Sequence, residues 1–424
     1  MHVLILAIGS AGDVHPFVGI GRALAERGHR VTLAANPYFE RLIRGVGLRF
    51  AAIGTLEQYQ SLIANAKVWQ SARGFVEVAR QGILPAVRWV HDLVLEHAGS
   101  DTVVVGSTLA LGARILQDRF DLPLVSVHLS PSIFRSLIRT PALPGLFTSD
   151  RTPRLVKSLQ FRVADMMIDS ILAGEVNAVR RQHALPPVRR VFDRWFHSPR
   201  LVLGLFPDWL APPQADWPPN VRLTGFPLYD ERDVISHNDE ADRFLAAGSP
   251  PIVFTPGSAM THGHKFFEAS VAACRRISQR GVLLTRFPDQ VPRDLGADLR
   301  HFEFLPLSWL LPRSAAIVFH GGVGTMSQAL AAGTPQLIMP MGFDQPDNAA
   351  RVIRLGVGAS ITPKRYQTER VARMLDELVT SASVAENCRA VAARFVGTTP
   401  LEDACLAIES QSRSAASFNA FGHA

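Results

Sequence analysis

The sequence is poor in cysteine, with only three in 424 residues. They form no C-x-x-C pair and show no metal-ligand spacing, a pattern typical of a reduced protein rather than one stapled by disulfides. The chain also has no G-x-x-x-x-G-K-[ST] run, which excludes a P-loop nucleotide site. We therefore expect neither a secreted disulfide scaffold nor a P-loop enzyme.

Long apolar runs are also missing. The longest nearly apolar stretch, residues 102–116, is too short to span a bilayer and contains Arg114. The first residues, MHVLILAIGSAGD, lack a basic segment and lose their apolar character at Gly9, so they indicate a buried strand rather than a signal peptide. We expect a cytoplasmic protein, with peripheral contact at the inner membrane as an open alternative.

Charge is modest. Charged residues make up 19% of the chain and the formal net charge is +7. Residues 135–200 alone hold twelve Lys or Arg against five Asp or Glu. A nucleic-acid binder would show a basic face with aromatic side chains between the charges, and none is evident, so nucleic acid is not an expected partner.

What the sequence does have is alternation of apolar strands with helical patterns, twice over. Residues 2–8 form a continuous apolar run, a glycine-containing turn follows, and a helix is predicted from about Phe17 to Arg27. The proline-rich stretch 207–220 cannot continue a helix or central strand, and after it the alternation restarts with PIVFTPGS. This pattern predicts an α/β fold with two βαβ domains, each with a parallel sheet.

A nucleotide site of the NAD type is not supported. Gly9 and Gly12 give G-x-x-G rather than G-x-G-x-x-G, and the second strand ends in Ala-Ala-Asn without an acidic residue for a ribose hydroxyl. These departures argue against a dinucleotide cofactor.

Residues 320–358, HGGVGTMSQALAAGTPQLIMPMGFDQPDNAARVIRLGVG, carry the most informative pattern. His320 is predicted at the end of a strand, followed by glycines and a helix N-terminus near Thr325, where bare amides favour a phosphate. After the next strand, Asp344 and Gln345 are expected at the same sheet edge. A carboxylate beside a carboxamide suits paired sugar hydroxyls. Together they predict a nucleotide-sugar site.

These residues resemble the donor signature of family 1 glycosyltransferases with the GT-B fold, H-x-G-x-G-T followed by D-Q-x-x-N-A. The opening GSAGDVHPFVGIGRALAERGHRV is similar to bacterial members of the same family. Within the family, the segments FPDWLAPPQADWP and TGFPLYD look closest to rhamnosyltransferases of rhamnolipid biosynthesis. The resemblance implies two Rossmann-like βαβ domains facing each other across an interdomain cleft.

Four segments follow from this architecture. Residues 1–215 would form the N-terminal acceptor-binding domain, 216–240 a linker and 241–400 the C-terminal donor-binding domain. Residues 401–424 would be a C-terminal helix or tail, with packing against the first domain as one expectation.

The resemblance implies an inverting displacement, in which an acceptor hydroxyl attacks the sugar C1 while a nucleoside diphosphate leaves. Asp13 holds the position of the family's base and is our candidate for removing the hydroxyl proton, with His15 as the fallback. Two structural alternatives stay open: Asp13 as a helix cap, and His15, before Pro16, as a turn residue.

For the leaving diphosphate, the resemblance implies His320, the amides around Gly322 and Gly324, and Thr325. Ser258, in the turn TPGS, matches a family turn that also contacts phosphate, with a plain βα turn as the alternative. The chain contains no D-x-D, the pattern that holds a metal in other glycosyltransferases, so we expect no metal and no other cofactor.

Two departures from the plant branch of the family concern the donor. Phe304 stands where that branch has a base-stacking Trp, and it can still stack on a pyrimidine. Gln328 stands where that branch has a Glu that holds both ribose hydroxyls. A weaker ribose grip fits a deoxyribose donor such as dTDP-L-rhamnose, with UDP-sugars as the alternative.

The acceptor-binding residues are not identifiable from the sequence. Low-charge helical stretches at residues 61–64, 82–87, 166–168 and 171–172 fit either ordinary packing or an apolar acceptor tunnel. The basic segment 135–200 could hold a fatty carboxylate or approach an anionic membrane, or be a solvated face. Coupling to the enzyme that makes the lipid acceptor is a further expectation.

The resulting hypothesis is transfer of L-rhamnose from dTDP-L-rhamnose to a 3-(3-hydroxyalkanoyloxy)alkanoic acid, forming a mono-rhamnolipid. The first alternative is a related transferase for a sterol, terpenoid or polyketide. The second, from another class, is a non-catalytic sugar-nucleotide binding module.

Overall fold

The computed structural model describes residues 1–69, 74–149, 151–234 and 238–412. Within these, the first half of the chain builds a parallel sheet in the order β3-β2-β1-β4-β5-β6-β7. Its strands are β1 (His2–Leu6), β2 (Arg30–Ala35), β3 (Arg49–Ala52), β4 (Thr102–Ser107), β5 (Leu124–His128), β6 (Leu201–Gly204) and β7 (Val221–Leu223). Strands β1 and β4 are almost wholly buried, as expected of a parallel sheet covered on both faces.

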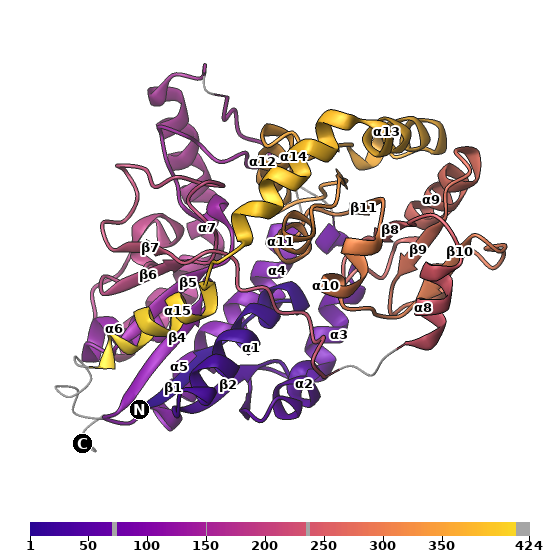
Figure 1. Ribbon diagram of the computed structural model, residues 1–424. Helices are drawn as coiled ribbons and strands as arrows, with labels where there is room; N and C mark the ends of the chain where they lie inside the picture. Colours follow the sequence, from indigo (N-terminus) through magenta and orange to yellow (C-terminus); the bar gives the residue numbers. More distant parts are fainter. Residues whose placement is uncertain (70–73, 150, 235–237, 413–424) are drawn as a thin grey trace.

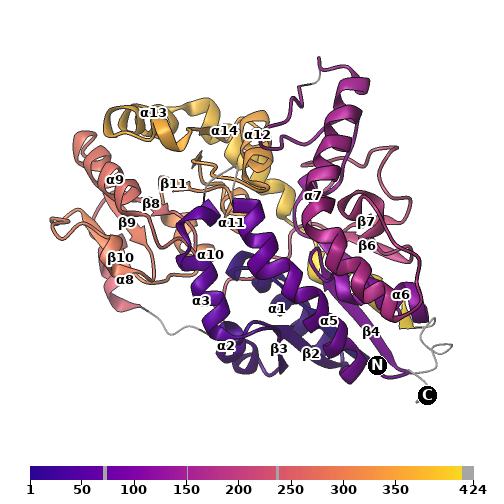
Figure 2. The same ribbon diagram turned by 180° about the vertical axis from the view of Figure 1, so that it is seen from behind.

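Helices cover both faces of this first sheet (Figures 1 and 2). The helices of this lobe are α1 (Ala11–Glu26), α2 (Glu40–Gly45), α3 (Leu56–Ala64), α4 (Gly74–Val78), α5 (Leu84–His97), α6 (Leu111–Phe120) and α7 (Arg154–Gln182), with the short turns η2 (Ala66–Trp69), η3 (Ala79–Ile83) and η5 (Val191–Trp195). At 29 residues α7 is far longer than the others, and its N-terminal end projects from the molecule in both views.

The second half builds another parallel sheet, in the order β10-β9-β8-β11-β12-β13. Its strands are β8 (Ile252–Thr255), β9 (Gly281–Leu284), β10 (Leu299–Phe302), β11 (Ala316–Phe319), β12 (Gln336–Ile338) and β13 (Gly358–Ser360). Its helices are α8 (Asp239–Ala246), α9 (His264–Arg276), α10 (Leu307–Leu310), α11 (Val323–Ala332), α12 (Gln345–Arg354), α13 (Thr368–Thr380) and α14 (Ala382–Ala392). The predicted α/β class with two Rossmann-like domains is confirmed.

Each sheet has one point where the strand order reverses, between β1 and β4 in the first and between β8 and β11 in the second. Loops that leave neighbouring strands in opposite directions open a crevice at the carboxyl end of such a point, where open α/β sheets bind ligands. The candidate residues Asp13, Ser258 and His320 follow β1, β8 and β11, so each crevice contains at least one of them.

The first helix begins earlier than the sequence pattern predicts. It starts at Ala11 rather than near Phe17, so Asp13 lies in the first helical turn and not on a free loop. Ser10 caps the helix in a box with Asp13, and Pro16 is held inside the helix. The prediction was wrong because residues 9–13 resemble a glycine-containing turn, whereas Ser10 and Asp13 together cap a helix that already begins at Ala11.

The predicted linker and the predicted C-terminal segment both contribute elements to the first lobe. Strand β7, which lies inside the stretch 216–240, pairs with β6 at the edge of the first sheet. The last described helix, α15 (Pro400–Glu409), packs against α1 of the first lobe, and Glu409 forms an ion pair with Arg27 at 2.7 Å. The chain therefore crosses between lobes twice. Residues 413–424 of the predicted tail lie outside the described residues.

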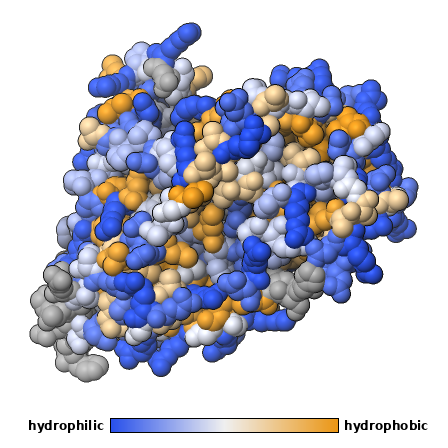
Figure 3. Space-filling model, viewed as in Figure 1, coloured by the Kyte–Doolittle hydropathy of each residue, from blue (hydrophilic) through white to orange (hydrophobic). Residues whose placement is uncertain are grey.

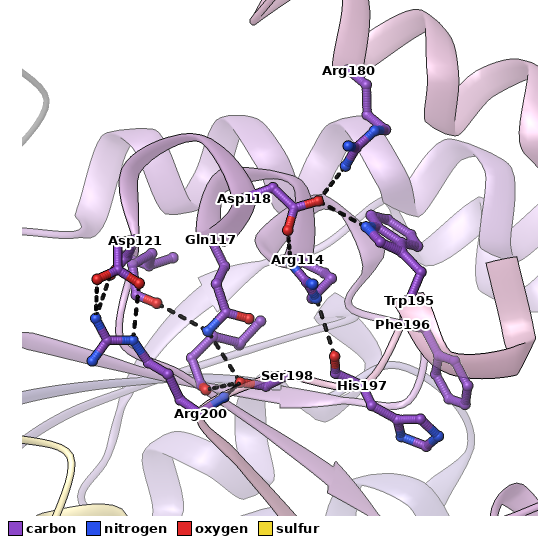
Figure 4. Close-up of polar contacts among 12 residues, drawn as sticks. Arg114, Gln117, Asp118, Asp121, Arg180, Trp195, Phe196, His197, Ser198 and Arg200 are labelled. Atoms are coloured by element: carbon purple, nitrogen blue, oxygen red, sulfur yellow. Dashed lines mark hydrogen bonds and ion pairs between the residues drawn. The ribbon is translucent and has the colours of Figure 1, made fainter. Parts of the chain in front are cut away.

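Part of the basic segment 135–200 is neutralised by ion pairs inside the first lobe. Figure 4 shows that the carboxylate of Asp118 in α6 accepts hydrogen bonds from Arg114, from Arg180 of α7 and from the indole nitrogen of Trp195, the last at 2.8 Å. In the same way Asp165 of α7 is paired with Arg135 and Arg190. These pairs tie α6, α7 and η5 together, so the charge excess of the segment is in part structural rather than a free basic face.

Candidate functional site

One large cavity of about 1590 Å³ opens between the carboxyl ends of the two sheets. Residues of both lobes line it, and every site residue predicted from the sequence is among them. These are Asp13, His15, Ser258, Phe304, His320, Gly322, Gly324, Thr325, Gln328, Asp344 and Gln345. Residues far apart in the sequence thus share one cleft, because both topological switch points open into it.

Asp13 sits at the start of α1 and is partly buried in the cleft wall. Its Oδ2 accepts hydrogen bonds from the backbone nitrogen of Ser10 at 2.7 Å and from the Ser10 hydroxyl at 3.1 Å. Within the described part of the chain, Oδ1 has no hydrogen-bond partner. Asp13 is therefore a helix cap through one oxygen, and the other remains for a ligand.

Burial raises the pKa of Asp13, and the two hydrogen bonds from Ser10 oppose that shift only in part. The physical cause is the loss of water around a carboxylate that has no cationic partner. A carboxylate with a raised pKa is a stronger base than an exposed one, which is the property that proton removal from a hydroxyl requires.

His15 is held by a residue that the sequence did not single out. Its Nε2 lies 2.8 Å from Oε1 of Glu231, and both side chains are largely buried. Burial alone would raise the pKa of Glu231, but the hydrogen bond and charge of His15 bring it below its ordinary value. Glu231 has a backbone φ of +63°, a left-handed conformation that non-glycine residues rarely adopt. The partner comes from the segment joining the lobes, so no local pattern could reveal it.

His320 lies directly after β11, and its ring is packed between the backbones of Gly257 and Gly322. A Cβ on Gly322 would stand 2.6 Å from its Nε2, and one on Gly257 would stand 2.9 Å from its Cε1. The imidazole therefore fits only because both positions lack side chains. Its Nδ1 is buried without a hydrogen-bond partner among the described residues. Burial lowers the pKa of His320 to about 4, so the ring is neutral near pH 7 and can donate one hydrogen bond.

Helix α11 points its N-terminus into the same space. Gly322 is its N-cap and supplies no side-chain cap, so the first amides of the helix remain available to an anion. A Cβ on Gly324 would lie 3.7 Å from the Cα of Gly12, which places the starts of α1 and α11 face to face across the cleft. Thr325 and the buried Gln328 follow on α11 and line the cavity.

Asp344 and Gln345 lie at the start of α12. Burial raises the pKa of Asp344 to about 7, a shift that the charge of Asp13 increases and a 2.8 Å hydrogen bond from Asn348 opposes. The Gln345 carbonyl accepts from the amides of Met341 at 2.8 Å and Gly342 at 3.1 Å. The expectation that the Gln345 carboxamide offers both an acceptor and donors to a sugar was wrong. Its side-chain oxygen already accepts from two loop amides, and only the NH₂ group remains for a ligand.

Phe304 is covered on one side by Arg286, whose guanidinium lies 5.4 Å from the ring centroid. Arg286 also donates to the hydroxyl of Tyr38 in the other lobe at 2.9 Å. It follows β9 without any recognisable motif, and sequence reasoning missed it. Ser258, in the turn after β8, is exposed to the cavity.

Beyond Asp13 the cavity continues as an apolar arm in the first lobe. Several of the low-charge stretches noted in the sequence contribute to its wall, whereas Val87 and Leu172 are core residues and Met166 faces outward. The members that line the arm are Leu62, Ile63, Gly82, Ile83, Ala86, Met167, Ile168 and Ile171, joined by Phe75, Leu109, Phe192 and Phe196.

Among the described residues, no group of three or more His, Cys, Asp or Glu side chains is arranged to hold a metal ion. That transfer needs no metal remains a prediction. Across the same residues, the structure contains no helix that is both long and apolar enough to cross a membrane.

Comparison with protein families gives two matches, one at each end of the chain. Residues 3–116 match the glycosyltransferase family 28 N-terminal domain, and residues 284–404 match the C-terminal domain of erythromycin biosynthesis protein CIII-like proteins. The first match contains Asp13 and His15, and the second contains His320 and Asp344.

Relatives cover the full architecture. O-mycaminosyltylonolide 6-deoxyallosyltransferase of Streptomyces fradiae is 29% identical, over 96% of this chain and 97% of its own. The solved glycosyltransferase of kitacinnamycin superposes with a TM-score of 0.72 at 19% identity, covering 97% and 98%. The spinosyn rhamnosyltransferase SpnG, solved with thymidine diphosphate, superposes with a TM-score of 0.64 at 19% identity, covering 95% and 98%.

Two Rossmann-like lobes with a shared cleft at their switch points define the GT-B class of enzymes. The N-terminal match and the relatives that span the whole chain are glycosyltransferases, to which this chain is similar over both lobes, and it is an enzyme, a hexosyltransferase. The alternative of a non-catalytic binding module is thereby set aside. The resemblance to the rhamnolipid branch remains a prediction.

Proposed function

We propose that the chain is an inverting transferase that moves L-rhamnose from dTDP-L-rhamnose to the hydroxyl of a 3-(3-hydroxyalkanoyloxy)alkanoic acid, forming a mono-rhamnolipid. The observation that carries this proposal is the continuity of one cavity, from the glycine-rich cradle after β11, past Asp13, into an apolar arm. A polar donor and an elongated apolar acceptor would meet at Asp13, where the two parts of the cavity join.

In the transfer step, the acceptor hydroxyl oxygen forms a bond to C1 of the sugar while the bond from C1 to the diphosphate oxygen breaks. The proton of the hydroxyl passes to Oδ1 of Asp13. The raised pKa of Asp13 favours this transfer. His15, fixed by Glu231 at 2.8 Å, is the second group that can receive a proton in this wall of the cleft.

The leaving diphosphate takes the negative charge. The uncapped N-terminus of α11 and the neutral His320 would stabilise it, with the Thr325 hydroxyl and Ser258 as further donors. Phe304 would stack on the base, while the NH₂ group of Gln345 and the Asp344 carboxyl would bind sugar hydroxyls. None of these roles requires a metal.

The acceptor arm supports an apolar acceptor without fixing its identity. A sterol, terpenoid or polyketide acceptor is the alternative, and it is favoured by the relative that glycosylates O-mycaminosyltylonolide. The arm lies beside α7, and two of its lining side chains, Phe147 and Met167, are themselves exposed at the surface. A cavity that reaches the surface suits acyl chains of variable length better than a rigid ring system.

The deciding experiment offers the purified protein dTDP-L-rhamnose and UDP-glucose, each with a panel of acceptors, and identifies products by mass spectrometry. Rhamnosylated hydroxyalkanoyloxy acid as the main product supports the proposal. A main product on a sterol or macrolide ring supports the alternative, and transfer of glucose in preference to rhamnose overturns the proposed donor.

A further inference from the structure

The outer end of the acceptor arm is rimmed by apolar side chains that no other part of the described chain covers. In the first half of α7, Leu155 is 82% exposed and Met166 is 66% exposed. Leu155, Leu159, Arg162 and Met166 follow at spacings of four, three and four residues, which places them on one helix face. We call this the outer face of α7.

The neighbouring face of the same helix belongs to the cavity. Val156, Val163 and Met167 line it, as does Leu159 at the boundary between the two faces. The third side of the helix, with Leu172 and the ion-paired Asp165, is buried in the lobe. One helix thus connects the core, the acceptor arm and an exposed apolar surface.

The loop before α7 extends this rim. Phe147 lines the cavity and is 76% exposed. Gln160 of α7 fixes the loop, because its side chain accepts from the Phe147 amide at 2.7 Å and donates to the Phe147 carbonyl at 3.2 Å. A large apolar ring is therefore held at the mouth of the cavity by specific bonds. In Figure 3, hydrophobic surface appears among hydrophilic surface at the upper left, where α7 begins in Figure 1.

Among the described residues, the exposed charge around this rim is basic. Over the described residues of the stretch 139–167, the exposed charged side chains are Arg139, Arg151, Arg154 and Arg162, whereas Asp165 is buried in ion pairs. Arginines beside exposed apolar side chains match a surface of anionic headgroups over acyl chains. The same arginines would not favour an apolar protein partner, since a buried unpaired charge is costly.

We propose that the outer face of α7 and Phe147 dock on an anionic lipid bilayer, so that the acceptor enters the arm from the membrane without crossing water. This deepens the proposed function and rests on it for the nature of the acceptor. The docking itself depends only on the surface, and it can be measured without any transfer reaction.

The test is co-sedimentation of the full-length protein with vesicles of phosphatidylglycerol and phosphatidylcholine, compared with phosphatidylcholine alone. We expect binding to the anionic vesicles that weakens as salt is raised. The double variant Leu155→Ser/Met166→Ser, which changes no cavity-lining residue, should bind them about tenfold less. Val396→Ser is the matched control, because Val396 is 84% exposed on the other lobe, and it should bind as the wild type does.

Arg154→Gln/Arg162→Gln should reduce binding by about tenfold on anionic vesicles and leave the weak binding to phosphatidylcholine unchanged. Binding that ignores both double variants, or no vesicle binding at all, overturns the docking proposal. A dimer in sedimentation velocity that Leu155→Ser/Met166→Ser dissociates would also overturn it, by assigning the face to a second copy.

Activity separates this proposal from the proposed function. Both double variants should retain wild-type turnover of a short-chain acceptor that is soluble in water. Vesicle binding without rhamnosyl transfer would leave the docking surface in place and remove the proposed function. Rhamnosyl transfer to the soluble acceptor without vesicle binding would do the reverse.

Discussion

At the scale of single residues, the helix-capping role of Asp13 and its proposed role as the base can be separated by experiment. Asp13→Asn keeps a side-chain oxygen that can accept from the Ser10 amide, but it cannot take a proton. We expect kcat to fall by about 10²–10⁴-fold, the usual contribution of a positioned base, while TDP affinity stays within about twofold. Steady-state kinetics and calorimetric titration with TDP measure the two effects.

Ser10→Ala is the matched control for Asp13, because it removes the hydroxyl bond to Oδ2 and leaves the carboxylate. It should keep most of the activity. The pH profile of the wild type gives a further check. The base works only when it is deprotonated, and burial raises the pKa of Asp13. As the pH is lowered, kcat/KM should therefore begin to fall at a pH above the usual pKa of an aspartate. Equal losses in Ser10→Ala and Asp13→Asn would reduce Asp13 to a cap.

Glu231 is expected to act through His15. Its carboxylate fixes the imidazole at 2.8 Å, and its lowered pKa keeps it charged throughout the pH range of the reaction. Glu231→Gln should lower kcat about tenfold and leave KM for the donor unchanged, since the ring loses its fixed orientation but no donor contact is removed. Glu231→Asp should recover part of kcat. Unchanged kcat in Glu231→Gln would show that the pair only joins the lobes.

The glycine at position 322 makes room for His320. Gly322→Ala would place a methyl group 2.6 Å from Nε2, so the imidazole must turn away from the diphosphate position. We expect TDP binding to weaken by about tenfold or more, one charge-assisted hydrogen bond in free energy. Gly174→Ala on α7, where an added Cβ meets nothing within 4 Å, is the control and should bind TDP normally. Normal TDP affinity in Gly322→Ala would separate His320 from the donor.

At the scale of elements, the buried carboxyl group of Asp344 at the start of α12 lowers the stability of the folded protein near neutral pH. The folded-state pKa of Asp344 is about 7 against 3.8 when unperturbed, so the folded protein holds a proton that the unfolded chain releases. Stability is therefore lost as pH rises from about 4 to about 7. Asp344→Asn should raise Tm by about 2 °C or more at pH 8 and by less at pH 5.

Thermal unfolding at the two pH values measures this difference. Asp376→Asn, at an exposed position of α13, is the control for loss of one carboxylate. A gain for Asp344→Asn that is equal at pH 5 and pH 8 would contradict the burial argument. The same variant should transfer more slowly, because it removes the carboxyl group that we propose binds a sugar hydroxyl.

Elements were the most predictable feature from sequence. Parallel strands buried on both faces give continuous apolar runs, so β1 and β8 were visible, and the glycines after His320 marked the start of α11. The start of α1 was misplaced because capping by Ser10 is local chemistry that resembles a turn. The partners Glu231 and Arg286 were missed because they reach the cleft only through packing of the two lobes, which no spacing in the sequence encodes.

At the scale of the whole molecule, the lobes meet through several polar contacts around the cleft. Arg286 donates to Tyr38, and the Thr261 hydroxyl donates to the Ile63 carbonyl at 3.1 Å. The starts of α1 and α11 face each other at Gly12 and Gly324. A nucleotide bound after β11 would therefore contact residues of both lobes, and it should stabilise the folded arrangement of the two.

TDP should accordingly raise Tm, because it binds the folded protein and has no site in the unfolded chain. At a concentration of 100 times Kd the expected stabilisation is about 2.7 kcal/mol. Asp13→Asn should keep this shift. EDTA should change neither the shift nor the rate, since in the proposed mechanism the helix dipole and His320 stabilise the diphosphate without a metal. UDP should shift Tm less than TDP if Gln328 gives the weak ribose grip expected of a deoxyribose donor. An EDTA-sensitive shift would require a metal on the diphosphate, and a larger shift with UDP would reverse the donor assignment.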